Sequence, residues 1–204
     1  TPLSVLKKAH AVGLINGDIP KKYGGKGWGL IESVVITEEF AAACPGLATS
    51  IFDNSLGMEP LSLSKNEALK KKYFAKIQKD FKLICFATSE PTMGSDVAGI
   101  RCKAERDGDD YILNGTKFWI TNGGIADVCL IFCRTDPSAG RRGISVVVVE
   151  RGTAGFVVGD LEDLCGMRAN PVSSIRLYDC RVPKTNLLAR EGMGLKIGLA
   201  ALDT

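Results

Sequence analysis

The ten residues GTKFWITNGG, at positions 115–124, decide how the middle of this chain is interpreted. Alternate side chains of a strand face opposite sides, so Trp119 and Thr121 share one face. Phe118 and Ile120 share the other face, and the pattern predicts that these two fill the core. The two glycines at the end then stop the strand in a flexible turn. A flat ring and a hydroxyl are thus presented outward together, which suits a planar partner with a polar edge.

Short strands are expected on both sides of this stretch. From Leu83 onward the hydrophobic pattern has a period of two or forms short buried runs. Asn114-Gly115 predicts a two-residue hairpin turn, whose central residues both need positive φ. The spacing favours an antiparallel barrel or sandwich over a parallel sheet. The expected strands are residues 83–88, 101–106, 110–113, 117–121, 128–134, 144–150, 156–158 and 174–178.

The first part of the chain carries a helical pattern instead. Apolar residues at spacings of three and four predict helices around residues 3–10, 31–39 and 69–77, and the pattern returns only near Leu195. Because the sequence ends within that last amphipathic helix, we expect a further segment to follow it. The fold class is therefore α+β, with an N-terminal helical domain at 1–82, a middle β-barrel domain at 83–190 and the start of a truncated C-terminal helical domain at 191–204.

Composition argues against several classes of protein. The 204 residues include 26 basic and 23 acidic side chains, well interspersed, so no nucleic-acid partner is expected. Seven cysteines without a CxxC pair predict reduced core thiols and a protein that is not secreted. The single histidine argues against a metal site. The longest apolar runs have the length of strands, so no transmembrane segment is expected.

Two glycine-rich stretches resemble nucleotide motifs only superficially. YGGKGWG at 23–29 lacks the spacing of a phosphate-binding P-loop, which favours a surface loop. GMGLKI at 192–197 has Ile where a dinucleotide fingerprint needs its third glycine, and no strand precedes it. This second stretch is expected to begin a helix, and no nicotinamide site is predicted.

A second segment supplies another side for a ligand site next to the Trp119 strand. The residues ATSEPTMGSD, at 87–96, leave a strand, turn at Pro91 and offer several hydroxyls and an approachable backbone at Gly94. Loops of this composition commonly bind ligands. The two segments together predict one binding site.

The motifs resemble those of the acyl-CoA dehydrogenase family. SEPTMGSD at 89–96 is similar to the family's TEPxAGSD, and NGTKFWITNG at 114–123 is similar to its NGxKxWITNG. The chain departs from the family at Ser89, where Thr is usual, and at Thr92-Met93, where a Gly-Ala pair is usual. We expect binding to survive both changes. Other stretches follow in the family's order over nearly the whole chain: IPKKYGG at 19–25, NSLG at 54–57, GMR at 166–168, CRVPKTNLL at 180–188 and GMGLKIGLAALD at 192–203.

The resemblance implies a site for FAD. Trp119 would pack on the isoalloxazine ring, and Thr121 would bond near the nitrogen that receives hydride. Ser95 would lie where flavin and acyl-CoA meet, and Asp203 matches a position that touches the pantetheine arm. The implied cofactor-binding residues are Phe86, Ala87, Thr88, Ser89, Gly94, Ser95, Trp119, Ile120 and Thr121, and the implied substrate-binding residues are Ser95 and Asp203.

The resemblance also implies the reaction, an α,β-dehydrogenation of an acyl-CoA thioester. The family's carboxylate base comes from the C-terminal domain, beyond Thr204, so no residue of this chain is expected to be catalytic and the chain alone is expected to be inactive. Glu90 is expected to be structural. The acyl tail would approach the helix that ends in NSLG. Phe52 and Ala48 there would favour short or medium chains, although an ordinary core role for Phe52 is an equal alternative.

Several functional alternatives remain open at this level. An acyl-CoA oxidase or a flavin monooxygenase has the same architecture and differs in how reduced flavin meets oxygen. A non-catalytic acyl-CoA-binding module would keep the scaffold without the base. For the dehydrogenase, the resemblance implies electron-transferring flavoprotein as acceptor and a dimer or tetramer at full length. The compartment would be the mitochondrial matrix in a eukaryote or the cytoplasm in a bacterium.

Overall fold

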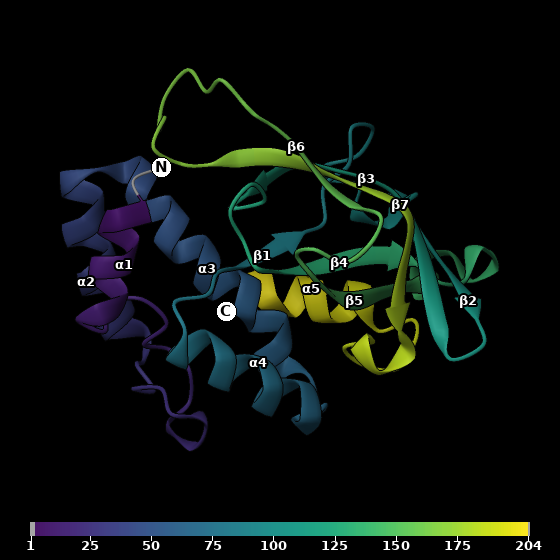
Figure 1. The fold of residues 1–204 in the computed structure, drawn as a ribbon, viewed down its shortest axis with the longest axis horizontal. Coiled ribbons are helices and arrows are strands. Elements are labelled where there is room, and N and C mark those ends of the chain that lie inside the picture. The colour runs from purple at the N-terminus through teal and green to yellow at the C-terminus, as the bar shows by residue number, and fades with distance from the viewer. Residues whose placement is uncertain (1–2, 204) are drawn as a thin grey trace.

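A computed structural model describes the protein from residue 3 to residue 203. Helices make up its N-terminal part (Figure 1). Residues 1, 2 and 204, which include the outer limits of two predicted domains, lie outside the described part. No helix within residues 3–203 combines the length and the apolar character needed to cross a membrane. The helices of this part are α1 (Leu3–Ala11), α2 (Leu30–Ala43), α3 (Pro45–Leu63) and α4 (Glu67–Lys79).

The helix boundaries follow local chemistry. α3 starts with Pro45, whose fixed φ and missing N–H suit the first position of a helix. The helix continues to Leu63, so the expected end at the NSLG stretch is wrong. Pro60 lies in its last turn. α4 starts where Asn66 accepts a hydrogen bond from the backbone N–H of Leu69 at 3.1 Å. The side chain of Asn66 therefore caps the first turn of α4.

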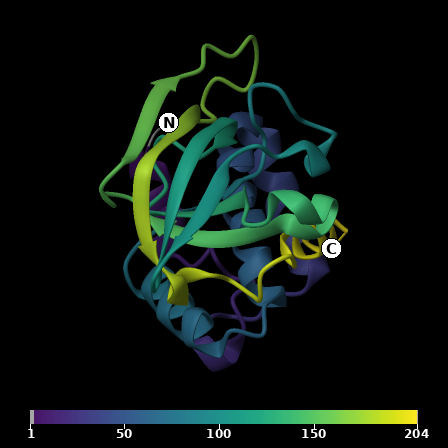
Figure 2. The same ribbon diagram turned by 90° about the vertical axis from the view of Figure 1, so that its right-hand side faces the viewer.

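A single curled sheet forms the middle of the chain (Figure 2). Its strand order is β1-β4-β2-β3-β7-β6, and β5 pairs with the other edge of β4. The expected strands at 128–134 and 144–150 are confirmed from end to end. The strands are β1 (Ile84–Ala87), β2 (Lys103–Asp107), β3 (Asp110–Thr121), β4 (Val128–Arg134), β5 (Ile144–Glu150), β6 (Phe156–Leu161) and β7 (Val172–Pro183).

The pairing is mostly antiparallel, with two exceptions. β1 runs parallel to β4 over its whole length, from Ile84 opposite Val128 to Ala87 opposite Ile131. β2 also meets β4 in parallel, at Lys103 and Arg134. The predicted antiparallel pairing therefore holds for most of the sheet. β1 departs from it because the long crossover through β2 and β3 brings the chain back in the same direction.

The predicted hairpin at Asn114-Gly115 is wrong. Both residues lie inside β3, where the pairing with β7 shifts its register. The turn falls earlier, between Asp107 and Asp110, with Gly108 at a φ of 61°. Gly115 has a φ of 150°, and a Cβ there would lie 2.7 Å from the Cα of Cys102. The glycine thus serves a bulge in a long strand, which the local turn signal does not distinguish from a hairpin.

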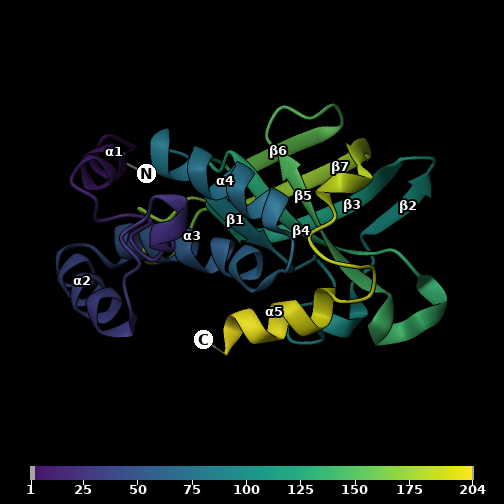
Figure 3. The same cartoon turned by 90° about the horizontal axis from the view of Figure 1, so that it is seen from below.

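The helices and the sheet share one hydrophobic core. α3 crosses β1 so closely that a Cβ on Gly57 would lie 2.8 Å from the carbonyl oxygen of Ile84. The last helix, α5 (Gly194–Leu202), returns beneath the sheet and lies alongside α3 (Figure 3). Gly198 of α5 faces the ring of Phe132 on β4. The side of α3 between β1 and α5 is where the candidate site forms.

Candidate functional site

A β-bulge near the end of β3 turns Trp119 outward. The register against β7 shifts between Lys117 and Ile120, and Trp119 adopts a φ of 54°. As a result Lys117 and Ile120 are both buried, while Phe118 is only half-buried. The prediction that Phe118 fills the core is wrong, because the extra residue interrupts the alternation of the strand. Trp119 faces outward as predicted and is 55% exposed.

A buried ion pair supports this bulge from below. The ammonium of Lys117 donates to the carboxylate of Glu90 at 2.8 Å, and the two side chains are 0% and 5% exposed. The same ammonium donates to the carbonyl oxygen of Thr88 at 2.9 Å. The Glu90 carboxylate also accepts from the backbone N–H groups of Arg101 and Cys102. Glu90 is therefore structural, as expected.

The same contacts fix residues 89–94, which we call the SEPTMG loop, beside β3. Glu90 and Met93 exchange backbone hydrogen bonds of 3.0 and 3.1 Å across a tight turn. The N–H of Phe118 donates to the carbonyl oxygen of Ser89 at 2.9 Å. The hydroxyl-bearing residues Thr88 and Ser89 are thereby placed next to the Trp119 bulge on a backbone that cannot shift without breaking these bonds.

A second set of hydrogen bonds ties the end of β3 to α3. Asn122, at a φ of 60°, is fully buried. Its side-chain carbonyl accepts from the Ser50 hydroxyl at 2.6 Å, and its amide donates to the Ser50 carbonyl oxygen at 2.8 Å. One turn further along α3, the side-chain carbonyl of Asn54 accepts from the N–H of Ile84 at 2.7 Å. The turn after β3 therefore ends the strand and also links it to α3.

These elements enclose a hollow of about 520 Å³, which we call the β3 hollow. Eight of the nine residues predicted to bind the cofactor line it, and only Ala87, which is buried, does not. Asp203 does not line it either and borders a separate shallow hollow at the end of α5. The lining residues are Asp53, Phe86, Thr88, Ser89, Gly94, Ser95, Val97, Trp119, Ile120, Thr121, Phe132, Leu195, Gly198, Leu199 and Leu202.

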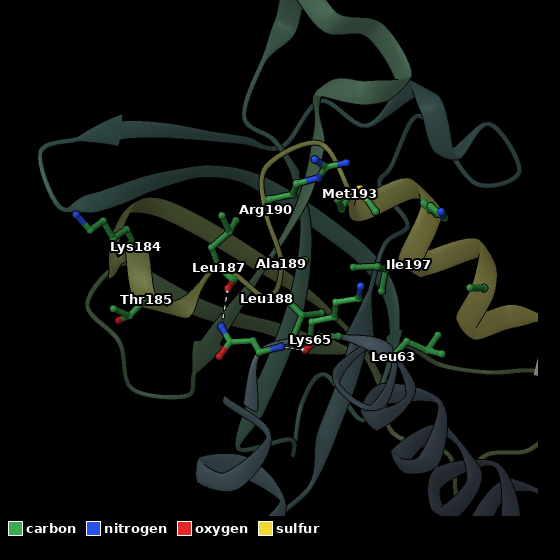
Figure 4. A pocket seen from close by; sticks show the side chains of 14 residues that line it. Leu63, Lys65, Lys184, Thr185, Leu187, Leu188, Ala189, Arg190, Met193 and Ile197 are labelled. Atoms are coloured by element: carbon green, nitrogen blue, oxygen red, sulfur yellow. Dashed lines mark hydrogen bonds between the residues drawn. The ribbon is translucent and has the colours of Figure 1, made fainter. Parts of the chain in front are cut away.

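A larger hollow, of about 820 Å³, lies on the other side of α5 (Figure 4). Lys65, Lys184 and Arg190 stand around an apolar floor that includes Leu188 and Ile197. None of the residues predicted to bind flavin or substrate lines this hollow. Its size does not make it the functional site, because the β3 hollow is the one that combines an exposed ring with several hydroxyls.

Family models match most of the chain. The model described as acyl-CoA dehydrogenase, N-terminal domain, matches residues 1–80, and the model described as acyl-CoA dehydrogenase, middle domain, matches residues 85–180. This chain belongs to the acyl-CoA dehydrogenase family. The two matched ranges meet in the turn between α4 and β1, where the helical part gives way to the sheet.

Individual relatives agree with this family. A probable medium-chain specific acyl-CoA dehydrogenase 2, mitochondrial, of Caenorhabditis briggsae is 36% identical over 99% of this chain and 50% of its own length. Butyryl-CoA dehydrogenase from Megasphaera elsdenii has a TM-score of 0.94 at 33% identity, covering 98% of this chain and 54% of its own. An acyl-CoA dehydrogenase complexed with FAD from Bacillus anthracis has a TM-score of 0.90 at 34% identity, covering 98% and 34%. The chain spans about half the length of the curated relatives it matches.

The β3 hollow fits the ring of the flavin that the family implies. Trp119 offers a largely exposed aromatic ring on one side. Nothing lies within 4 Å of the position that a Cβ on Gly94 would take, so the loop leaves free space where a planar group can approach. Hydroxyls of Thr88, Ser89 and Thr121 line the same hollow. The described residues thus supply a stacking surface and polar atoms for an isoalloxazine edge.

Three residues that shape this site are not predicted from the sequence. From the sequence alone Lys117 is expected at the surface, because a lysine is buried only when it has a partner and the sequence does not show one. Asn122 reads as part of a turn, although the motif places it where it can reach α3. Asp53 lies in the stretch SIFDNSLG, where a lone acidic residue between Phe52 and Asn54 is the only signal.

Proposed function

We propose that this chain is the N-terminal and middle part of an FAD-dependent dehydrogenase that forms an α,β double bond in an acyl-CoA thioester. The observation that carries the proposal is the arrangement of the β3 hollow. There the exposed ring of Trp119 and the hydroxyl-bearing loop are held side by side by the buried Lys117–Glu90 pair. Family membership adds the reaction class, since relatives of similar fold are acyl-CoA dehydrogenases.

Each residue of the hollow has a proposed task. Trp119 stacks against the isoalloxazine ring, and Thr121 donates a hydrogen bond to its polar edge. Thr88 and Ser89 bond to the ring's other polar atoms, while Phe86 and Ile120 close the apolar side. Gly94 and Ser95 face the boundary between cofactor and substrate. When bound, FAD supplies the hydride acceptor, and these residues fix its position and exclude water.

The general base is proposed to lie outside this chain. Asp203 is kept as a proposed contact for the pantetheine arm, at the end of α5. We expect this chain alone to show no steady-state oxidation of any acyl-CoA with an artificial electron acceptor. Measurable turnover would contradict the assignment of the base. For the whole protein we propose electron-transferring flavoprotein as acceptor, assembly as a dimer or tetramer, and a mitochondrial matrix or bacterial cytoplasmic location.

The acyl end of the substrate is proposed to lie between α2 and α3. Phe52 and Ala48 both border a mainly apolar hollow of about 360 Å³ there, which we call the α2–α3 hollow. A phenyl ring at this place shortens the space for a chain, which favours short or medium acyl groups. An activity profile of the whole enzyme that peaks at long acyl chains would contradict this assignment.

Visible absorption spectroscopy of the purified chain tests the cofactor site first. FAD is added, unbound flavin is removed by desalting, and the spectrum is compared with that of a mock-treated sample. The expected result is a retained flavin band with a shifted shape, because stacking on Trp119 changes the environment of the ring. If FAD neither stays with the protein nor quenches its tryptophan fluorescence during titration, the proposed site is wrong.

A further inference from the structure

Asp53 occupies a wall between two hollows of the protein. It is the one residue that lines both the β3 hollow and the α2–α3 hollow. Among the described residues that line these two hollows, Asp53 also has the only ionisable side chain. The remaining walls are apolar or carry neutral hydroxyls. A ligand group in either hollow can therefore come close to this carboxyl group.

The carboxyl group of Asp53 has no partner in the described part of the chain. Its Oδ2 atom is shielded from solvent and makes no hydrogen bond with any described residue. Burial raises the pKa of this carboxyl group to about 7. The ionisable residue of β1 is Cys85, whose pKa is raised well above its usual range by a hydrogen bond to Cys129 and by burial, so it offers no charge. A buried polar atom without a partner costs free energy, which a suitable ligand group would recover.

The protein holds this carboxyl group in place. The neighbouring Asn54 is fully buried and bonded to Ile84, and Ser50, one turn earlier, is bonded to Asn122. Those two residues and Gly57 lie on the face of α3 that packs against the sheet. Asp53 sits next to that face, so α3 cannot rotate to expose the carboxyl group to water without breaking the hydrogen bonds of Ser50 and Asn54.

We propose that Asp53 selects acyl-CoA substrates whose acyl chain carries a hydrogen-bond donor, such as a hydroxyl group. This inference rests on the proposed function, because it takes the β3 and α2–α3 hollows as the path of the acyl group. A hydroxyl on the chain donates to the carboxyl oxygen that otherwise lacks a partner. Where the Asp53 carboxyl group is ionised, above about pH 7, a chain that ends in a carboxylate is disfavoured by like charge. A plain alkyl chain leaves the cost of burial unrelieved.

The test uses pairs of thioesters that differ by one hydroxyl group. Isothermal titration with the FAD-loaded chain compares 4-hydroxybutyryl-CoA with butyryl-CoA, and 6-hydroxyhexanoyl-CoA with hexanoyl-CoA. At least one hydroxylated compound is expected to bind about fivefold more tightly than its parent, the effect of one net hydrogen bond. Succinyl-CoA, with a carboxylate on a chain of equal length, is expected to bind more weakly than butyryl-CoA.

Substitutions then assign the preference to the carboxyl group. D53A is expected to abolish the preference for hydroxylated chains and to improve binding of the plain chains. D53N keeps the size of the side chain, so it serves if D53A fails to fold, and it should remove the discrimination against succinyl-CoA. D160A, which removes an exposed aspartate of β6 that lines neither hollow, should leave all affinities unchanged.

The possible failures are distinguishable. Equal affinity within both pairs, unaffected by D53A, overturns the selective role of Asp53 and leaves the proposed function standing. Absence of binding for every acyl-CoA by a chain that retains FAD overturns the selection together with the proposed acyl path. A preference for hydroxylated chains that persists in both D53A and D53N also overturns the inference.

Discussion

The ammonium group of Lys117 and the carboxylate of Glu90 meet at 2.8 Å beneath the bulge that presents Trp119. The pair links β3 to the SEPTMG loop. These two segments are separate in the sequence but border the same hollow. Both charges are cut off from water, so each depends on the other for compensation. The position of the SEPTMG loop relative to Trp119 therefore depends on this ion pair as well as on packing.

Removing one partner of this pair should be strongly destabilising. We expect Lys117→Met to lower the free energy of unfolding by about 3 to 5 kcal/mol, because Glu90 keeps a buried charge without its counter-ion. Urea denaturation followed by circular dichroism measures the effect. Lys103→Met, at an exposed lysine whose contact with Glu105 is 3.9 Å long, is the matched control and should change stability by less than about 0.5 kcal/mol. Similar small effects of both substitutions would contradict the structural role of the pair.

The ring of Trp119 should matter for flavin and little for folding. Trp119→Ala is expected to weaken FAD binding by about fivefold, since stacking of aromatic rings contributes on the order of 1 kcal/mol. Fluorescence titration with FAD measures the dissociation constant. Tyr178→Ala removes an aromatic residue of similar exposure, 58% against 55%, that does not line the hollow. An equal loss of affinity in both variants would show that the effect is general rather than local.

Two glycines give opposite expectations for the same substitution. Gly57→Ala places a Cβ 2.8 Å from the carbonyl oxygen of Ile84, so we expect a loss of stability of about 1 to 3 kcal/mol. Gly94→Ala meets no atom within 4 Å and should leave the melting temperature unchanged. The added methyl group at Gly94 should still weaken FAD binding, because it projects into the space proposed for the cofactor. Thermal melts and FAD titrations of both variants separate the two effects, and unchanged FAD affinity in Gly94→Ala would argue against the proposed ring position.

Acid should remove the contribution of one ion-pair cluster between α4 and β5. Hydrogen bonds from Lys72 and Lys76 lower the pKa of Glu150 from its ordinary value of 4.5 to about 2. A lowered pKa means that the stabilisation is complete above about pH 5 and is lost as the pH falls towards 2. Glu150→Gln should therefore be less stable than the wild type by on the order of 1 kcal/mol near neutral pH, and the difference should vanish at about pH 2. Denaturation curves across this range would refute the assignment if the difference stayed constant.

The buried carboxyl group of Asp53 should have the opposite dependence. Its pKa is raised from 3.8 to about 7, so the folded state holds a proton that the unfolded state releases, and stability falls as the pH rises through this interval. Asp53→Asn removes this loss. Relative to the wild type the variant should gain stability between pH 4 and pH 7, by no more than about 4 kcal/mol, the value for three units of pKa. A stability difference that does not change with pH would mean that Asp53 acquires a partner in solution.

Some of the fold could be predicted because its signals are strong and local. β4 and β5 are continuous apolar runs buried on both faces, so their limits coincide with the limits of the hydrophobic pattern. The cap at Asn66 and the helix that follows it are likewise readable from neighbouring residues. In these segments local preference and tertiary packing require the same conformation.

The errors arise where a distant strand decides the local conformation. Asn114-Gly115 has the chemistry of a turn, yet pairing with β7 keeps it inside a strand, and the side chain of Asn114 instead exchanges hydrogen bonds with Asp179. The same pairing forces the bulge that buries Lys117 in place of Phe118. The partner of Lys117 lies in another loop, so no local pattern indicates that a lysine belongs in the interior.

The pairing of β3 with β7 has a consequence for how the protein is made. Asp110 lies opposite Pro183 and Thr121 opposite Val172, so the strand that carries Trp119 keeps an open edge until residues 172–183 have left the ribosome. Contacts between such distant segments form slowly, because a long loop must close first. The end of β3 that carries Trp119 is accordingly among the last parts of the sheet to be completed during synthesis. Until then its unpaired edge is the segment most exposed to pairing with other nascent chains.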